Sequence, residues 1–300
     1  MKKQKIIAIV GPTATGKSTL AVVLARQFQG EIISADSRQI YTGLSIGTGK
    51  ITKKEMLGIP HHLLDISNPK KIVSVHEYAL KARKALGSII KNNRVPIVCG
   101  GTGFYIDTFL FEKTYPEVPP NTSLRAKLET FSTAELIKKL TTLDSRRAKE
   151  IDPHNRVRII RALEIINAIG KVPKIKTSSP HDVLCIGLKT DEKFLKAQIK
   201  KRLDARIKKG MIAEAINLHA KGLSYKRMNE LGLEYKYLSL YLQRRITKQE
   251  MTGQLETAIW QYSRKQMTWF RKNPDIVWLD PKQKSTVTKA SKLVKEFLTS

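Results

Sequence analysis

Eight residues near the N-terminus have the types and spacing of a phosphate-binding loop. They are, in order, Gly11, Pro12, Thr13, Ala14, Thr15, Gly16, Lys17 and Ser18. Glycines let a backbone wrap closely around an anion, and the amides at the start of a helix point at it. Lys17 adds a positive charge, and the Ser18 hydroxyl can hold Mg²⁺. The pattern predicts a phosphate site with Mg²⁺ as cofactor, but it identifies neither the phosphate compound nor the reaction.

The segments on either side of the loop are those that such a site requires. Residues 5–10 (KIIAIV) form a short apolar run typical of a buried parallel strand. Residues 18–28 (STLAVVLARQF) have the apolar-rich pattern of a helix. Because strand, loop, Lys-Ser pair and helix are all in register, we favour phosphate binding over a glycine-rich turn without a ligand.

Two further apolar runs end in residues suited to a ligand site. Residues 31–34 precede Asp36 and Ser37, and residues 95–101 lead into a glycine-rich turn that contains Thr102. Ligand groups collect at the carboxyl ends of strands in an open parallel sheet. We therefore expect Asp36 beside the phosphate loop if the two strands are neighbours. A plain tight turn before a helix at Phe104 is the alternative for the second segment.

The αβ rhythm breaks at residues 115–121 (YPEVPPN), after which residues 122–170 indicate helices without a buried strand. A strand pattern returns at residues 183–188. The sequence thus predicts an α/β core, residues 1–111 and 183–300, with a helical insertion at 112–182. In the insertion Arg158 and Arg161 share a helix face, as do Arg161 and Glu164, which indicates either an internal ion pair or a phosphate-facing edge.

The C-terminal part is strongly basic. The chain carries a net charge of +29, which indicates a polyanionic partner unless the source proteome is lysine-rich in general. We expect a long helix over residues 192–220 with a basic face that includes Arg202, and a second over residues 247–272. Aromatic and basic residues alternate near the end of the second helix. They either stack on unpaired bases or form core with a solvated rim.

Composition excludes several classes of protein. With 41% hydrophobic residues the chain has ample material for a core, so disorder is excluded. Cys99 and Cys185 lie in apolar runs and indicate buried thiols in a reducing compartment. We find no zinc-type spacing, and His61-His62 does not indicate a metal site. The N-terminal apolar run is too short for a signal peptide and no stretch suits a membrane span, so we expect a cytoplasmic protein.

Taken together, five segments resemble the tRNA dimethylallyltransferase (tRNA isopentenyltransferase) family in its bacterial form. They are GPTATGKS at 11–18, SADSRQIY at 34–41 with GTGK at 47–50, GGTGFYI at 100–106, DPHNRVRIIRALEI at 152–165, and SRKQMTWFRK at 263–272. The resemblance spans nearly the whole chain. It implies an α/β fold with a P-loop NTPase-like parallel sheet core flanked by helices, and an all-helical insertion domain that contacts tRNA.

The resemblance also implies a reaction: transfer of a dimethylallyl group from dimethylallyl diphosphate to N6 of adenosine 37, next to the anticodon, in tRNAs that read codons beginning with U. Asp36 would be the general base, Thr102 would contact the diphosphate and orient Asp36, and Arg202 would clamp the diphosphate. The loop 11–18 would hold the diphosphate, with Mg²⁺ on Ser18. Residues implied in tRNA binding are Ser37, Gln39, Arg158, Arg161, Arg264, Gln266 and Trp269. A monomer is expected.

The sequence departs from the family pattern in two places. Gln198 stands where relatives usually carry an arginine, and the usual Gly-Tyr pair is replaced by Gly232-Leu233-Glu234-Tyr235. Three other functions remain open: a P-loop small-molecule kinase, an adenylate isopentenyltransferase, and a non-catalytic RNA-binding protein. The kinase leaves the insertion and the charge unexplained, whereas the adenylate enzyme differs only in its acceptor.

Overall fold

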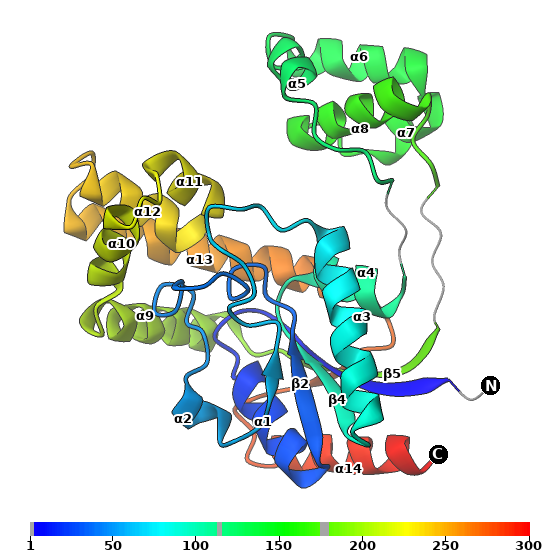
Figure 1. Cartoon of the computed structure of the whole chain (residues 1–300), viewed down its shortest axis with the longest axis vertical. Helices are drawn as coiled ribbons and strands as arrows, with labels where there is room; N and C mark the ends of the chain where they lie inside the picture. Colours follow the sequence, from blue (N-terminus) through cyan, green and yellow to red (C-terminus); the bar gives the residue numbers. More distant parts are fainter. Residues whose placement is uncertain (1–2, 113–115, 175–179) are drawn as a thin grey trace. The chain divides into compact units, whose positions relative to one another are not determined.

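The computed structural model describes residues 3–112, 116–174 and 180–300. The chain divides into two compact units (Figure 1). We call Met1–Phe111 with Ser179–Ser300 the core unit, and Glu112–Ser178 the insertion. The sequence pattern places the end of the insertion at residue 182, whereas the next strand of the core unit already begins at His181.

The core unit is built on a parallel sheet, to which the described residues contribute six strands. Their spatial order is β3 (His61–His62), β2 (Gly30–Ser34), β4 (Val95–Cys99), β1 (Gln4–Val10), β5 (His181–Leu188) and β6 (Val277–Leu279). β1 and β2 are not direct neighbours, which was the condition for placing Asp36 beside the phosphate loop, because β4 pairs with both of them. The glycine-rich turn after β4 therefore lies between the phosphate loop after β1 and the Asp36 segment after β2.

Both faces of the sheet are buried, as the continuous apolar runs predict. Ile7 and Ile9 of β1 pack on the face covered by α1 (Lys17–Gln27) and α14 (Thr286–Thr299). Ile6 and Ala8 pack on the other face, with residues from α3 (Val75–Lys91), α4 (Gly103–Leu110) and α13 (Lys248–Phe270) (Figure 1). The two layers of helices fix the strand ends that carry the loops.

The prediction of one long helix over residues 192–220 is wrong. The segment forms two helices, α9 (Glu192–Lys208) and α10 (Met211–Ala220). They are separated at Gly210, whose φ of 102° is in the left-handed region. Glycine adopts that conformation without steric cost, so the chain can turn there. The short helices α2 (Lys53–Met56), α11 (Tyr225–Leu231) and α12 (Leu233–Leu242) complete the core unit in the described residues, and the predicted second long helix is confirmed as α13.

Within residues 116–174 the regular secondary structure of the insertion is all helical. Its helices are α5 (Thr122–Glu129), α6 (Thr133–Leu143), α7 (Ser145–Glu150) and α8 (Arg156–Ile169). The Glu164 side chain is fully buried and accepts hydrogen bonds from Arg125 at 2.7 and 2.8 Å and from Arg161 at 3.4 Å. Of the two interpretations of Arg161, the structure supports the internal ion pair.

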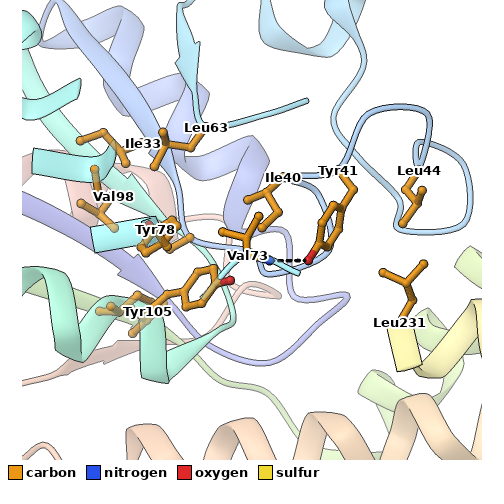
Figure 2. Close-up of a cluster of buried hydrophobic side chains, with 14 of the residues drawn as sticks. Ile33, Ile40, Tyr41, Leu44, Leu63, Val73, Tyr78, Val98, Tyr105 and Leu231 are labelled. Carbon is orange, nitrogen blue, oxygen red and sulfur yellow. Dashed lines mark hydrogen bonds between the residues drawn. The ribbon is translucent and has the colours of Figure 1, made fainter. Parts of the chain in front are cut away.

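Figure 2 shows part of a buried hydrophobic cluster, in which Tyr78 and Tyr105 lie near Ile33 of β2. Tyr78 and Tyr105 stack with ring centroids 4.0 Å apart, and the Tyr78 hydroxyl donates to the carbonyl oxygen of Ser34 at 3.1 Å. The Tyr41 hydroxyl accepts from the amide of Val73 at 3.2 Å, which Figure 2 shows as a dashed line. The first bond fixes the backbone at Ser34, just before Asp36, and the second holds the side chain of Tyr41, which follows the Asp36 segment.

Candidate active site

The phosphate loop has the backbone that its glycines predict. Gly11 (φ 135°) lies so close to β5 that an added Cβ would be 2.5 Å from the carbonyl oxygen of Leu188. Gly16 (φ 83°) is the left-handed residue from which α1 begins. The Lys17 ammonium donates to the carbonyl oxygen of Pro12 at 2.5 Å, within its own loop. The amides at the start of α1 and the Lys17 charge are thus placed around one space.

That space is a pocket lined by Lys17, Ser18, Asp36 and Arg202, among others. Burial, opposed by nearby acidic groups and reinforced by the charge of Arg202, lowers the pKa of Lys17 to about 8. Partial desolvation of the guanidinium and the neighbouring charge of Arg206 likewise lower the pKa of Arg202, although the residue as a whole is exposed. A bound anion would offset the repulsion between these two cations and stabilise their charged forms. The pocket is therefore suited to a phosphate or diphosphate group.

Asp36 presents a carboxylate to the same pocket. Its Oδ1 accepts hydrogen bonds from the amides of Arg38, at 2.8 Å, and Gln39, at 3.3 Å. From the described residues, no such bond reaches Oδ2. One oxygen thus orients the carboxylate, and the other can accept a proton from a substrate.

Thr102 joins the turn after β4 to the Asp36 segment. Its Oγ1 accepts from the amide of Ser37 at 3.1 Å, and its own amide donates to the carbonyl oxygen of Ala35 at 3.1 Å. The contact with Asp36 is indirect, through the adjacent residue Ser37. The alternative of a plain tight turn does not account for these bonds.

Arg202 approaches from α9. Its Nη2 donates to the carbonyl oxygen of Gly49 at 2.9 Å, so the GTGK segment at 47–50 holds the guanidinium at the pocket. Gln39 also lines the pocket, and its Nε2 donates to the carbonyl oxygen of Thr48 at 3.5 Å.

The residues implied in tRNA binding have varied surroundings. Gln266 is buried and bonds two backbone groups, whereas Arg264 on the same helix is exposed. Trp269 is half-buried, edge-to-face with Phe104 at 6.3 Å, and Phe270 is buried. Core packing therefore accounts for Phe270 and part of Trp269, and the nearby cations remain at the surface.

Arg158 and Arg161 belong to the insertion and not to the core unit that forms the pocket. Arg158 is exposed on α8, and Arg161 is in the ion pair with Glu164. Within the described residues, Arg158 is therefore exposed and has no ion pair, whereas Arg161 has one.

Sequence reasoning missed several residues that line the pocket. Tyr262 is one of them, and burial raises the pKa of its hydroxyl to about 12. His61 and Cys99 also line it, and burial lowers the pKa of His61 and raises that of Cys99 to about 11. Tyr262 could have been found, since it lies one helical turn before Gln266 on the same face of α13.

The described residues contain no cluster of three or more His, Cys, Asp or Glu side chains that could hold a metal ion. This is compatible with Mg²⁺, which usually keeps several waters and binds through one or two protein oxygens together with substrate phosphates. In residues 3–112, 116–174 and 180–300, none of the helices combines the length and hydrophobicity that crossing a bilayer requires.

A parallel sheet whose first strand leads through a glycine-rich loop into a helix, with Lys17 and Ser18 at the loop's end, defines the P-loop class of α/β proteins. A family model described as IPP transferase matches residues 39–273. The chain belongs to the IPP transferase family, which confirms the resemblance drawn from the five segments.

Relatives and solved structures agree. A tRNA dimethylallyltransferase of Anoxybacillus flavithermus is 38% identical over 283 residues, covering 92% of this chain and 90% of the relative. The full-length tRNA isopentenylpyrophosphate transferase of Bacillus halodurans superposes with a TM-score of 0.76 at 32% identity, covering 99% and 97% of the two chains. A eukaryotic dimethylallyltransferase acting on tRNA gives a TM-score of 0.83 at 25% identity, covering 99% of this chain and 80% of that one.

Proposed function

We propose that this chain is a prenyltransferase that moves a dimethylallyl group from dimethylallyl diphosphate to N6 of adenosine 37 of tRNA. The observation that carries the proposal is the pocket in which the Asp36 carboxylate lies with Lys17 and Arg202. A carboxylate and an anion site in one pocket suit a reaction in which a nucleophile loses a proton and a diphosphate departs. The names of the relatives support this choice of donor group and acceptor.

The reaction is a substitution at the allylic carbon. The N6–carbon bond forms as the carbon–oxygen bond to the diphosphate breaks, and the proton of the amine passes to the free Oδ2 of Asp36. Lys17, the loop amides and Arg202 stabilise the negative charge that develops on the leaving diphosphate. Thr102, bonded to Ser37, holds the Asp36 segment in place.

Ser18 lines the pocket and offers an oxygen ligand, so Mg²⁺ fits beside the diphosphate. When bound, the ion would neutralise part of the leaving group's charge.

The positive charge of the chain supports tRNA as the acceptor of the dimethylallyl group. The chain carries +29, and Arg264 of the core unit and Arg158 of the insertion are exposed. Lys and Arg side chains displace counterions from a phosphate backbone, and a base that reacts in a pocket must first leave its stack. We propose that both units contact the anticodon stem-loop of tRNAs reading codons that begin with U, and that the enzyme acts as a cytoplasmic monomer.

The test is incubation with labelled dimethylallyl diphosphate, Mg²⁺ and bulk tRNA, followed by location of the label. We expect it on adenosine 37, and Asp36→Asn to lower the rate by about 100-fold or more, the scale of a general base. The Asn oxygen can still accept from the amides of Arg38 and Gln39, so the fold is kept. Equal or better use of AMP than of an anticodon stem-loop would contradict tRNA as acceptor, and γ-phosphate transfer from ATP at kinase rates would contradict prenyl transfer.

A further inference from the structure

The loop Ser45–Gly49 connects the pocket to a second layer of residues. Thr48 lines the pocket, and the carbonyl oxygen of Gly49 accepts the hydrogen bond from Arg202 Nη2 at 2.9 Å. The direction of the Arg202 guanidinium therefore depends on where this loop is held. The residues that hold it lie outside the phosphate loop and outside the Asp36 segment.

One carboxylate binds the amides of the loop. Glu214 of α10 accepts hydrogen bonds at Oε2 from the amides of Ser45, at 3.0 Å, and Ile46, at 2.7 Å. At Oε1 it accepts from the amide of Gly47, at 2.8 Å, and from the hydroxyl of Tyr235, at 2.7 Å. Both oxygens are thus occupied by neutral donors, and the negative charge is met by three consecutive amides of one loop. Such charge-assisted bonds are stronger than neutral ones.

The opposite side of the same loop is held by a cation. Arg206 Nη1 donates to the carbonyl oxygen of Gly47 at 2.5 Å and to Oε1 of Glu234 at 2.8 Å. The peptide groups of Gly47 are therefore bound by Glu214 on the N–H side and by Arg206 on the C=O side. No room is left for a side chain, because a Cβ on Gly47 would be 2.7 Å from the Tyr235 hydroxyl oxygen, and Tyr235 is 1% exposed.

We propose that Glu214 is a positioning residue for prenyl transfer: it fixes Ser45–Gly47 so that the Gly49 carbonyl directs Arg202 at the leaving diphosphate. The inference rests on the proposed function, since it takes the diphosphate as the ligand of Arg202. Glu214 itself acts through the loop and touches no substrate.

Glu214→Gln tests the proposal with little change of shape. The Gln carbonyl oxygen can still accept from Ser45 and Ile46, but its NH₂ group then faces the Gly47 amide, donor against donor. We expect the rate constant of label transfer, measured under single-turnover conditions, to fall about tenfold. This is the effect of leaving one buried amide without its acceptor. The KM for tRNA should not change. Tyr235→Phe keeps the carboxylate and its three amide bonds and should give a smaller loss. Glu192→Gln, on the exposed first turn of α9, is the matched control.

The decisive measurement repeats Glu214→Gln in an Arg202→Ala background. If Glu214 acts through Arg202, the second substitution costs nothing further, and backbone amides 45–47 exchange hydrogen faster in Glu214→Gln whatever residue 202 is. A tenfold loss that persists in the Arg202→Ala background would overturn the proposal, as would a Glu214→Gln enzyme within twofold of wild type. Failure of the proposed function is a distinct result, in which the wild-type protein itself transfers no label to tRNA.

Discussion

The side-chain amide of Gln266 donates a hydrogen bond from Nε2 to the carbonyl oxygen of Gly101, 2.8 Å away. Its other end accepts from the amide of Thr13 at 2.9 Å. One side chain of α13 thus joins the phosphate loop to the turn after β4. The resemblance assigned Gln266 to tRNA binding, and the structure adds that it orders two loops of the pocket.

Replacing Gln266 should therefore disturb the diphosphate site. In Gln266→Ala the carbonyl of Gly101 loses its donor and the Thr13 amide loses its acceptor, at a cost of about 1–3 kcal/mol for each buried group. We expect transfer to fall by about tenfold or more, with a raised KM for dimethylallyl diphosphate. The control is Gln261→Ala on the exposed face of the same helix. An unchanged KM for the diphosphate would show that the two loops keep their geometry without this amide.

The depressed pKa of Lys17, about 8, predicts a pH dependence of anion binding. Below pH 8 the amine is charged and attracts the diphosphate, and above it the free site loses that charge. Inorganic diphosphate only gains negative charge as pH rises, so its own ionisation cannot cause weaker binding to a cationic site. Affinity for inorganic diphosphate should therefore weaken as pH rises through about 8, by up to about tenfold per pH unit.

Lys17→Arg distinguishes this cause from others. An arginine stays charged over the whole range, so the weakening above pH 8 should disappear even if absolute affinity falls. Isothermal titration with diphosphate between pH 7 and pH 10 measures both proteins. If the affinity of Lys17→Arg for diphosphate also weakened above pH 8, the weakening would be due to a group other than Lys17. For folding the sign is opposite: burial of charged Lys17 costs stability below pH 8, and that cost diminishes as pH rises toward the unfolded value of 10.5.

Local features of the site could be predicted from the sequence, and long-range ones could not. The phosphate loop and Asp36 follow from short segments, because a glycine-rich strand-to-helix loop and a polar strand end are encoded within a few residues. Two features depend on contacts between distant segments of the chain. One is the position of β4 between β1 and β2, and the other is the pair of hydrogen bonds by which the Gln266 side chain joins two loops. The break at Gly210 was missed because one glycine inside a helical pattern costs only about 1 kcal/mol, so the pattern does not decide it.

Two glycines in contrasting surroundings give a prediction for stability. A Cβ on Gly100 would be 2.2 Å from the carbonyl oxygen of Ala35, a backbone atom that cannot turn aside. Gly87, inside α3, has open space around it. Gly100→Ala should lower the free energy of unfolding by about 1–3 kcal/mol through overpacking. Gly87→Ala should raise it by about 0.5–1 kcal/mol through helix propensity. Urea denaturation of the full chain compares them, and equal effects would contradict the close approach at Gly100.

The last prediction concerns the insertion, whose folding depends on a buried charge. Glu164 is fully buried and accepts from both Nε and Nη2 of Arg125, from the amide of Asn121 at 2.8 Å and from Arg161. Burial alone would raise its pKa, but the bonds from Arg125 and Asn121 outweigh burial and hold the pKa of Glu164 below its usual value.

Glu164→Gln should destabilise the insertion by about 3 kcal/mol or more, because Arg125 and Arg161 are left without their anion. Hydrogen exchange of α5 and α8 in the full chain should accelerate, while the strands of the core unit stay protected; Glu129→Gln, exposed on α5, is the control. Since the folded pKa is depressed, the stabilisation is complete above the unfolded value of 4.5 and is lost as pH falls through the folded value. The wild-type insertion should therefore begin to exchange like Glu164→Gln only in that acid range. Equal protection of the two proteins at neutral pH would show that the ion pair does not hold the helices together.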